Sequence, residues 1–329
     1  MRPAFVLPFD VQPNLAGTMD IQIPSLAWEP LPNGRFRRVY YLDSHAVTVE
    51  VTEGKSALHF SYIPPDPALA ARLEALLERT FFRMIHSLVL DANPTLRSLY
   101  DRYQGVIIMH SDPFEALVLT ILSQNRTGEI VRRVYPTLDE RCGGVTAHSL
   151  AALSLDDLRG VIRPAGPYKA SRLAETVARV MAEGEDTFHT RIVDAPGAEA
   201  QAYLESLPGV GHKTAACVLV YSALSTTTLP VDTHLFRVVD RLGLAQHTGT
   251  NNKTTREALI NNLLAYGSDL APAHFLFLLV GRDTCLKASP TCTACFLQPH
   301  CHFATSGPRV APIPARRVQV SASRTRRNT

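Results

Sequence analysis

The stretch 207-LPGVGHKTAACVL-219 constrains the fold most, because a proline and two glycines fall between two helical segments. The sequence before it, 197-GAEAQAYLES-206, and the sequence after it both carry apolar residues at helical spacing. Pro208 ends the first helix, while Gly209 and Gly211 permit positive φ and the close approach of another backbone. The second helix is expected to begin near His212 with unpaired amides pointing outward. Such a turn suits a bound phosphate, although any tight helical hairpin shares this pattern.

Lys213 lies in the first turn of that second helix, where the helix dipole disfavours a cation. It either contacts a phosphate in spite of the dipole, or the same field with partial desolvation lowers its pKa and exposes a neutral amine. A neutral amine can attack an electrophilic carbon and form a Schiff base. The sequence by itself leaves both alternatives open.

Asp232 follows Lys213 by 19 residues, within 229-LPVDTHLFRVVDRLGL-244. Its position predicts the N-cap of the next helix, and for an isolated aspartate a cap is a sufficient explanation. An ionised carboxylate near Lys213 could also stabilise positive charge on a sugar whose base departs, or accept a proton from the attacking amine.

Four of the six cysteines are crowded into 285-CLKASPTCTACFLQPHC-301, with the spacing C-x6-C-x2-C-x5-C. Such crowding in a long chain with reduced thiols indicates a metal site more than disulfides. Only Cys292 and Cys295 form the close pair typical of a zinc knuckle, so an iron–sulfur cluster, zinc and disulfides all stay open on spacing alone.

The rest of the chain predicts a small N-terminal β-containing domain followed by helices. Valines alternate with polar residues over 47–52, a turn follows at EGK, and a second alternating run covers 58–62, so we expect a β-hairpin. Helical spacing then appears around 69–77 and over 113–124, 150–162, 170–183, 197–206, 212–223, 233–241, 254–265 and 271–281. We place the domain boundaries at 1–90, 91–284, 285–305 and 306–329.

Charge and hydropathy exclude some classes of protein and favour others. The net charge of +3 is too small to indicate a nucleic-acid partner by itself. Residues 306–329, however, carry six arginines and no acid, and they predict a disordered basic tail that attracts phosphate. No apolar run is long enough for a membrane span, and the N-terminus has poor signal-peptide chemistry, so we expect a cytoplasmic, nucleoid-associated protein. We expect a monomer.

Three motifs in order resemble the endonuclease III family of helix–hairpin–helix DNA glycosylases. They are LPGVG-H-KTA, then VDTH with R-V-x-x-R-L-G, and then the four-cysteine spacing, and together the resemblance covers roughly residues 93–305. The N-terminal region resembles 3-methyladenine glycosylase II and 8-oxoguanine glycosylase, on element order and a few residues such as Asp112-Pro113-Phe114-Glu115. The resemblance implies a mainly α fold with two helical subdomains behind an N-terminal antiparallel β-containing domain.

The resemblance implies roles for named residues. Lys213 corresponds to the Schiff-base lysine and Asp232 to the essential aspartate, while Cys285, Cys292, Cys295 and Cys301 correspond to the ligands of a [4Fe–4S] cluster. Asn125 stands where the family has a glutamine that fills the gap left by the extruded base, and Gln124 precedes it. Contacts to DNA are expected at these two residues and at Leu207, Gly209, Val210, Gly211, His212, Tyr168, Lys169 and Lys287.

The function that these features predict is a base-excision repair enzyme acting on damaged double-stranded DNA, with the damaged nucleotide flipped into a pocket. We expect a DNA N-glycosylase with AP lyase activity that removes oxidised bases, pyrimidines above all, through a Schiff base and β-elimination. A glycosylase for alkylated or oxidised purines is the first alternative, and a non-catalytic DNA-binding helix–hairpin–helix protein is the second.

Overall fold

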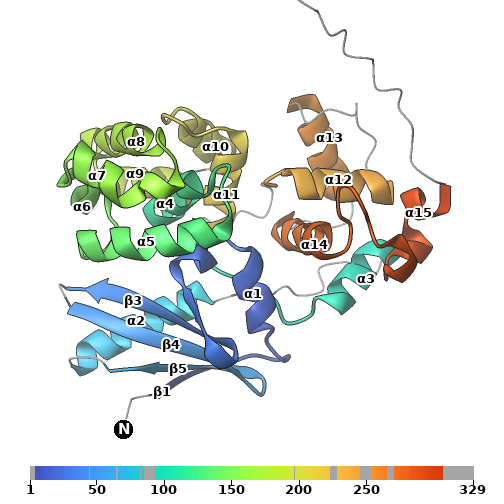
Figure 1. The fold of residues 1–329 in the computed structure, drawn as a ribbon, viewed down its shortest axis with the longest axis horizontal. Helices are drawn as coiled ribbons and strands as arrows, with labels where there is room; N and C mark the ends of the chain where they lie inside the picture. Colours follow the sequence, from blue (N-terminus) through green and yellow to red (C-terminus); the bar gives the residue numbers. More distant parts are fainter. Residues whose placement is uncertain are drawn as a thin grey trace, which may run out of the picture.

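The structure is a computed structural model in which residues 4–43, 45–63, 66–81, 83–84, 93–195, 197–222, 228–244, 253–264 and 270–306 are described. The predicted basic tail beyond residue 306 and the expected boundary at residues 90 and 91 lie outside these residues. Figure 1 shows a sheet domain below two groups of helices. No helix in the described part of the chain is both long and apolar enough to cross a membrane.

The sheet domain is built on the predicted hairpin. Five antiparallel strands lie in the order β1-β5-β4-β3-β2. Val51 pairs with Phe60 and Val49 with Tyr62, so the apolar positions of both strands share one buried face. The strands are β1 (Ala4–Pro8), β2 (Glu29–Leu31), β3 (Arg35–Leu42), β4 (His45–Gly54) and β5 (Ala57–Tyr62).

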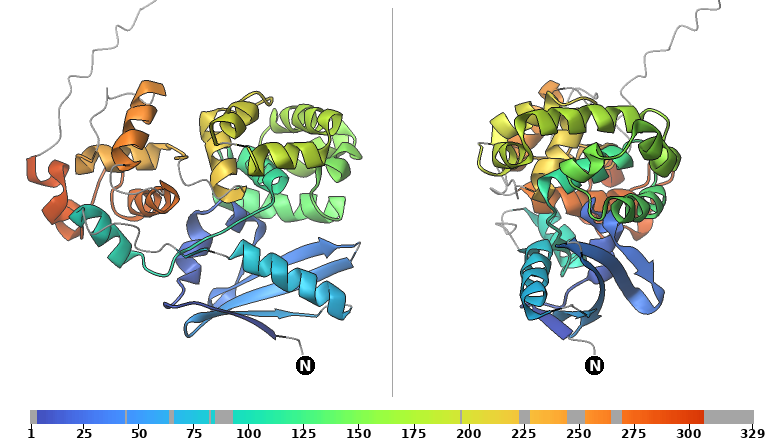
Figure 2. Two further views of the ribbon diagram at one scale, coloured as in Figure 1. Left: turned by 180° about the vertical axis from the view of Figure 1, so that it is seen from behind. Right: turned by 90° about the vertical axis from the view of Figure 1, so that its left-hand side faces the viewer.

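Helix α2 (Pro67–Thr80) lies along this sheet, as Figure 2 shows from behind. Its Leu69, Leu73 and Leu77 are buried, as their helical spacing predicts. Phe81 closes the layer, with its ring 5.4 Å from that of Phe60. The sheet and α2 therefore bury one apolar layer, which is continuous with the core of the helices.

The helices form two lobes that face each other across a gap in Figure 1. The first lobe contains α4 (Pro113–Ser123), α5 (Gly128–Cys142), α6 (Ala147–Ala151), α7 (Leu155–Ile162), α8 (Lys169–Glu183), α9 (Glu185–Val193), α10 (Gly197–Glu205) and α11 (His212–Ser222). The second lobe contains α3 (Pro94–Arg102), α12 (Thr233–Leu242), α13 (Lys253–Leu264), α14 (Leu270–Asp283) and α15 (His302–Ser306). The predicted mainly α class with an N-terminal β-containing domain is confirmed.

The predicted helices were incomplete, and one was wrong; α1 (Leu15–Ile21) and α3 were not predicted. The segment 150–162 is not one helix, because Ser154 caps a new helix by accepting the N–H of Asp157 at 3.1 Å. Helix α9 was missed. Helix α5 was also missed, and it continues through Pro136, although proline usually interrupts a helix.

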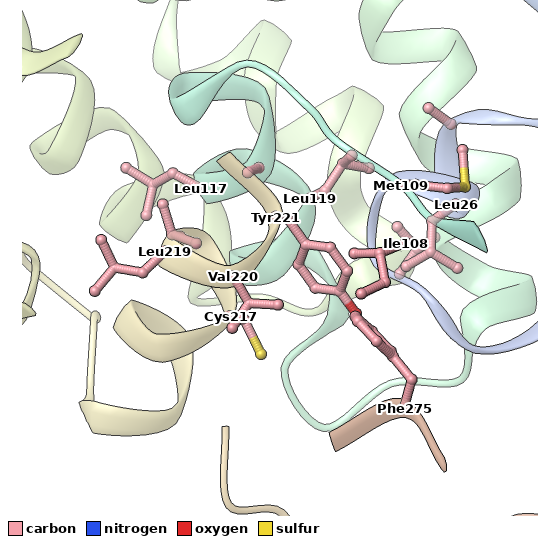
Figure 3. Packing of buried hydrophobic residues seen from close by; sticks show 14 of the residues in the cluster. Leu26, Ile108, Met109, Leu117, Leu119, Cys217, Leu219, Val220, Tyr221 and Phe275 are labelled. Carbon is pink, nitrogen blue, oxygen red and sulfur yellow. The ribbon is translucent and has the colours of Figure 1, made fainter. Parts of the chain in front are cut away.

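Helices α4 and α11 form the centre of the molecule. Both are buried along nearly their whole length. Figure 3 shows Leu117 and Leu119 of α4 beside Val220 and Tyr221 of α11, with Phe275 of α14 against the Tyr221 ring at 5.7 Å. Leu26 reaches the same cluster from the N-terminal part of the chain, and Ile108 and Met109 reach it from the segment between α3 and α4. The N-terminal region therefore packs into the centre of the helical region.

A buried ion pair also joins the sheet to the first lobe. Arg38 of β3 pairs with Glu115 of α4, and each side chain is only 11% exposed. Glu115 also accepts the hydroxyls of Tyr135 at 2.9 Å and Ser111 at 2.8 Å. A buried carboxylate needs such partners, so this cluster fixes the sheet on the helices.

Candidate active site

Lys213 is the second residue of α11, directly after the hairpin turn, as the sequence predicts. Gly209 has φ of 75°, a conformation that glycine adopts without strain, and its missing side chain leaves room for Arg172. The side chains of Leu207 and Val210 are buried and anchor the turn. Because α11 is packed on every side below its first turn, the position of Lys213 is fixed by the core.

Asp232 caps α12 and so confirms the expected N-cap. One carboxylate oxygen, Oδ1, accepts the N–H of His234 at 2.9 Å and that of Leu235 at 2.8 Å. The cap directs the side chain by local geometry alone. The second oxygen is not used by the cap and is available for a different contact.

Lys213 and Asp232 line the same pocket, although they belong to different helices, α11 of the first lobe and α12 of the second. Helix α1 (Leu15–Ile21) and the residues after it form a further wall of this pocket, so the N-terminal region contributes directly to it. The lining residues are Asp20, Gln22, Ile23, Leu26, Ser123, Arg126, Gly128, Lys213, Cys217, Tyr221, Asp232, His234, His274, Leu278 and Arg282.

His274 of α14 is a buried polar residue of this pocket that the sequence analysis missed. Burial lowers its pKa to about 4, with Lys213 acting in the same direction and Asp232 opposing it, so the ring is neutral at physiological pH. It hydrogen-bonds the backbone of Pro230, two residues before Asp232. Its Nδ1 has no hydrogen-bond partner within the described residues. A histidine inside the otherwise apolar run 270–281 was the signal that could have found it.

Cys217 lies one helical turn after Lys213 and is buried in the same pocket wall. Burial raises the pKa of its thiol to about 11, while Lys213 lowers it and Asp232 raises it further. The thiol is therefore protonated at physiological pH. The sequence gives no sign that this cysteine lies in the pocket wall, because its contact with the pocket depends on how α11 packs.

The residues expected to contact DNA divide into exposed and internal ones. Asn125, Tyr168, Gly211 and Lys287 are exposed, with Tyr168 at 75%. His212 is half-buried, and its Nδ1 lies 2.9 Å from Glu205 Oε1, which ties α11 back to α10.

Three of the groups expected to contact DNA donate hydrogen bonds within the protein instead. Val210 N–H donates to the carbonyl of Leu207 at 3.1 Å, so this amide closes the turn and does not face a phosphate. The amide of Gln124 donates to Gly209 O at 3.0 Å and to Thr214 Oγ1 at 3.1 Å. Lys169 is only 8% exposed, and its ammonium donates to the carbonyls of Leu122 and Gln124. A direct contact between Lys169 and DNA does not fit this position.

The four clustered cysteines line one pocket between α12, α14 and the loop that follows. All six cysteines of the chain are free thiols, so the disulfide alternative is not realised. Arg241 holds the loop by donating to Cys285 Sγ at 3.3 Å and to the carbonyl of Leu286 at 2.7 Å. Within the described ranges, no three His, Cys, Asp or Glu side chains already stand close enough to hold a metal ion. Four thiols around one pocket nevertheless match the donor set of an iron–sulfur cluster.

Known proteins resemble the chain in sequence and in fold. A family described as the HhH-GPD superfamily base excision DNA repair protein matches residues 118–262. Endonuclease III of Thermotoga maritima is 34% identical over 196 residues, which are 59% of this chain and 84% of that protein.

Two solved structures extend the comparison. A trapped covalent intermediate of endonuclease III with DNA superposes with a TM-score of 0.52 at 25% identity, covering 67% of this chain and 99% of that one. The apo 8-oxoguanine glycosylase/lyase of Clostridium acetobutylicum gives a TM-score of 0.68 at 18% identity, covering 85% and 96%. The second match extends over more of this chain, but its low identity speaks only for the fold.

Proposed function

The chain belongs to the endonuclease III family of base excision DNA repair glycosylases. We propose that it is a bifunctional enzyme that removes oxidised bases, above all pyrimidines such as thymine glycol, and then cleaves the strand as an AP lyase. The observation that carries this proposal is the convergence of Lys213 and Asp232 on one pocket from facing lobes. A nucleophile and an electrostatic stabiliser are the two groups that this chemistry requires.

In the proposed reaction, damaged double-stranded DNA lies across the mouth of the pocket with one nucleotide flipped into it. The amine nitrogen of Lys213 attacks the sugar C1′, the bond between C1′ and the base nitrogen breaks, and the base leaves with that electron pair. Loss of protons from the amine and opening of the sugar ring give the Schiff base. Removal of a proton from C2′ then expels the 3′ phosphate by β-elimination.

Asp232 would act through the oxygen that the helix cap leaves unused. Its negative charge stabilises the positive charge that develops on the sugar as the base departs. Because the other oxygen is held by two backbone amides, the carboxylate is preorganised and needs little reorientation during the reaction. His274, kept neutral by burial, adds no competing positive charge beside it.

The exposed residues around the pocket would hold the DNA. Gly211 at the start of α11, together with His212, offers backbone amides to a phosphate. Asn125 would enter the gap in the duplex, and Tyr168 and Lys287 would contact the backbone on either side. These contacts position the enzyme without reading sequence. We further propose a monomer that works at the nucleoid.

Cys285, Cys292, Cys295 and Cys301 would hold a [4Fe–4S] cluster. When bound, such a cluster crosslinks the loop through four thiolate bonds. Arg241 already donates to the loop carbonyls on one side of the pocket, so the two together would fix Lys287 on the DNA-facing surface. A brown protein whose visible absorbance disappears in Cys295→Ser supports this assignment, and a colourless zinc-containing protein refutes it.

Borohydride trapping tests the proposed function. The protein is incubated with a duplex that contains thymine glycol, and the reductant converts a Schiff base into a stable protein–DNA adduct. The wild type is expected to form the adduct, and Lys213→Gln is expected to form none. Lys55→Met, an exposed lysine in the turn between β4 and β5, serves as a control for loss of one positive charge. Base release without any adduct would show a glycosylase that lacks the lyase step.

A glycosylase for oxidised or alkylated purines is a second candidate, and one observation favours it. The pocket has a wall made of Asp20, Gln22 and Ile23, which lie before residues 118–262, the region that the HhH-GPD superfamily matches. An additional wall changes which bases fit. Release of 8-oxoguanine or 3-methyladenine in the same assay, without release of thymine glycol, would decide for this candidate.

A further inference from the structure

The loop that joins α4 to α5 contains an unusual backbone conformation at an exposed position. Asn125 has φ of 53°, in the left-handed region that side chains other than glycine rarely adopt. Asparagine tolerates this region better than most residues, but the conformation still costs free energy. The residue is exposed beside the pocket that contains Lys213. Something in the surrounding structure must therefore hold the loop in this shape.

Contacts from three separate segments hold the loop. Gln124 donates to Gly209 O and Thr214 Oγ1, which fastens the loop to the hairpin. Arg126 Nε donates to the carbonyl of Ala165 at 2.8 Å, which fastens it to the turn before α8. Arg126 Nη1 also donates to the carbonyl of Asn125 at 3.1 Å. The side chains on either side of Asn125 are thus fixed.

Lys169 provides the contact from below. Its ammonium donates to the carbonyl of Gln124 at 2.7 Å and to that of Leu122, two carbonyls that the end of α4 leaves without helical partners. A cation is favourable at this place, because it faces the negative end of the helix dipole. The contact acts on the peptide unit that directly precedes Asn125.

The position of Lys169 is costly for an ammonium in other respects. Burial lowers its pKa to about 8, and the neighbouring guanidinium groups of Arg126 and Arg172 act in the same direction. An apolar side chain of similar length would fill the space without this cost. The lysine therefore serves a purpose that packing alone does not explain.

We propose that Lys169 is a positioning residue for DNA binding, whose ammonium holds the Gln124–Asn125 backbone so that Asn125 enters the gap left by the extruded base. This inference rests on the proposed function, in which Asn125 takes that role. Lys169 itself touches no DNA, because its ammonium is directed into the protein. It acts only through the loop.

A double-mutant cycle with Lys169→Met and Asn125→Gly tests the proposal. Methionine keeps the length of the side chain and removes the donors. Glycine keeps the positive φ and removes only the side chain that would enter the duplex. The probe is a duplex with a tetrahydrofuran abasic analogue opposite 2-aminopurine, whose fluorescence reports both binding and unstacking.

Each single substitution is expected to weaken binding about tenfold and to reduce the fluorescence change. The affinity of the double variant for the duplex is expected to equal that of whichever single variant binds less tightly, because both substitutions act through one loop. Lys55→Met is the matched control and is expected to bind like the wild type. Additive losses in the double variant, or an unchanged affinity of Lys169→Met, would overturn the proposal.

A second readout separates positioning from a general loss of structure. A single-stranded oligonucleotide with an abasic site presents no gap between paired strands, so borohydride trapping on it needs Lys213 but not Asn125. Lys169→Met is expected to trap this oligonucleotide as fast as the wild type does. An equal loss on both substrates would show that Lys169 merely stabilises the fold. If the wild type binds the duplex but traps neither substrate, the proposed lyase chemistry fails, while the binding cycle still decides the role of Lys169.

Discussion

The Asp232 carboxylate has two roles that substitutions can separate. Its Oδ1 caps α12 by accepting two backbone amides, at 2.9 Å and 2.8 Å. Asparagine keeps an acceptor oxygen at the same place and loses the charge, whereas alanine loses both. Asp232→Asn is therefore expected to keep the stability of the wild type. Asp232→Ala is expected to lose about 1 kcal/mol, the usual value of an N-cap, which lowers the Tm by roughly 2 °C in a chain of this size.

The two variants are expected to lose activity together. Removing one preorganised electrostatic group from an active site costs about 100- to 1,000-fold in rate, or ~3–4 kcal/mol of the barrier. Single-turnover release of base from the thymine glycol duplex measures this loss, and a thermal melt of the same samples measures stability. Activity should therefore follow the charge, while Tm should follow the cap.

Asp66 offers the matched control, because it caps α2 by accepting Leu69 N–H at 2.8 Å and lies in the N-terminal domain. Asp66→Ala should lower the Tm by a similar amount and leave base release unchanged. The reasoning is refuted if Asp232→Asn retains the rate of the wild type, since the carboxylate would then be only a cap. It is equally refuted if Asp232→Asn loses as much Tm as Asp232→Ala.

Three other predictions concern separate parts of the chain. Arg38→Met should lower the free energy of unfolding, measured in urea, by about 3–5 kcal/mol, because Glu115 then stays buried without its cation. Adding Glu115→Gln should recover part of the lost stability. If it recovers none, the uncompensated charge of Glu115 is not the cause of the loss. The lowered pKa of His274 means that the unfolded chain binds more protons, so wild-type stability should fall as pH drops from about 6.5 to about 4. His274→Gln should lack this component in urea midpoints taken across the same window. Deleting residues 307–329 removes six arginines and should reduce the salt dependence of DNA binding in fluorescence anisotropy; an unchanged slope would exclude the tail from the interface.

The pocket draws its walls from both helical lobes and from the N-terminal region. Arg282 of α14 donates to the carbonyl of Asp20 at 3.0 Å, which joins two of these parts at the pocket. A change in how the N-terminal region packs would therefore alter the pocket directly. We therefore expect the N-terminal region to affect which bases fit the pocket.

Local features of the sequence determined much of this protein. The start of α11 at His212, the cap at Asp232 and the β4–β5 hairpin follow from residues within a few positions of each other. Turn chemistry, capping and side-chain alternation depend on short-range geometry, so neighbouring residues are sufficient to predict them. The crowding of four cysteines is likewise visible in the chain itself.

Tertiary structure alone decided which of these features meet and where side chains point. Lys169 stands at the start of a helix and looks from the sequence like a surface cation, yet packing turns its ammonium toward the end of α4. His274 and Asp20 come to the pocket from opposite ends of the chain, and no short-range pattern connects them to Lys213. The direction of a side chain depends on which distant elements cover the faces of its helix, and that is settled only when the whole core packs.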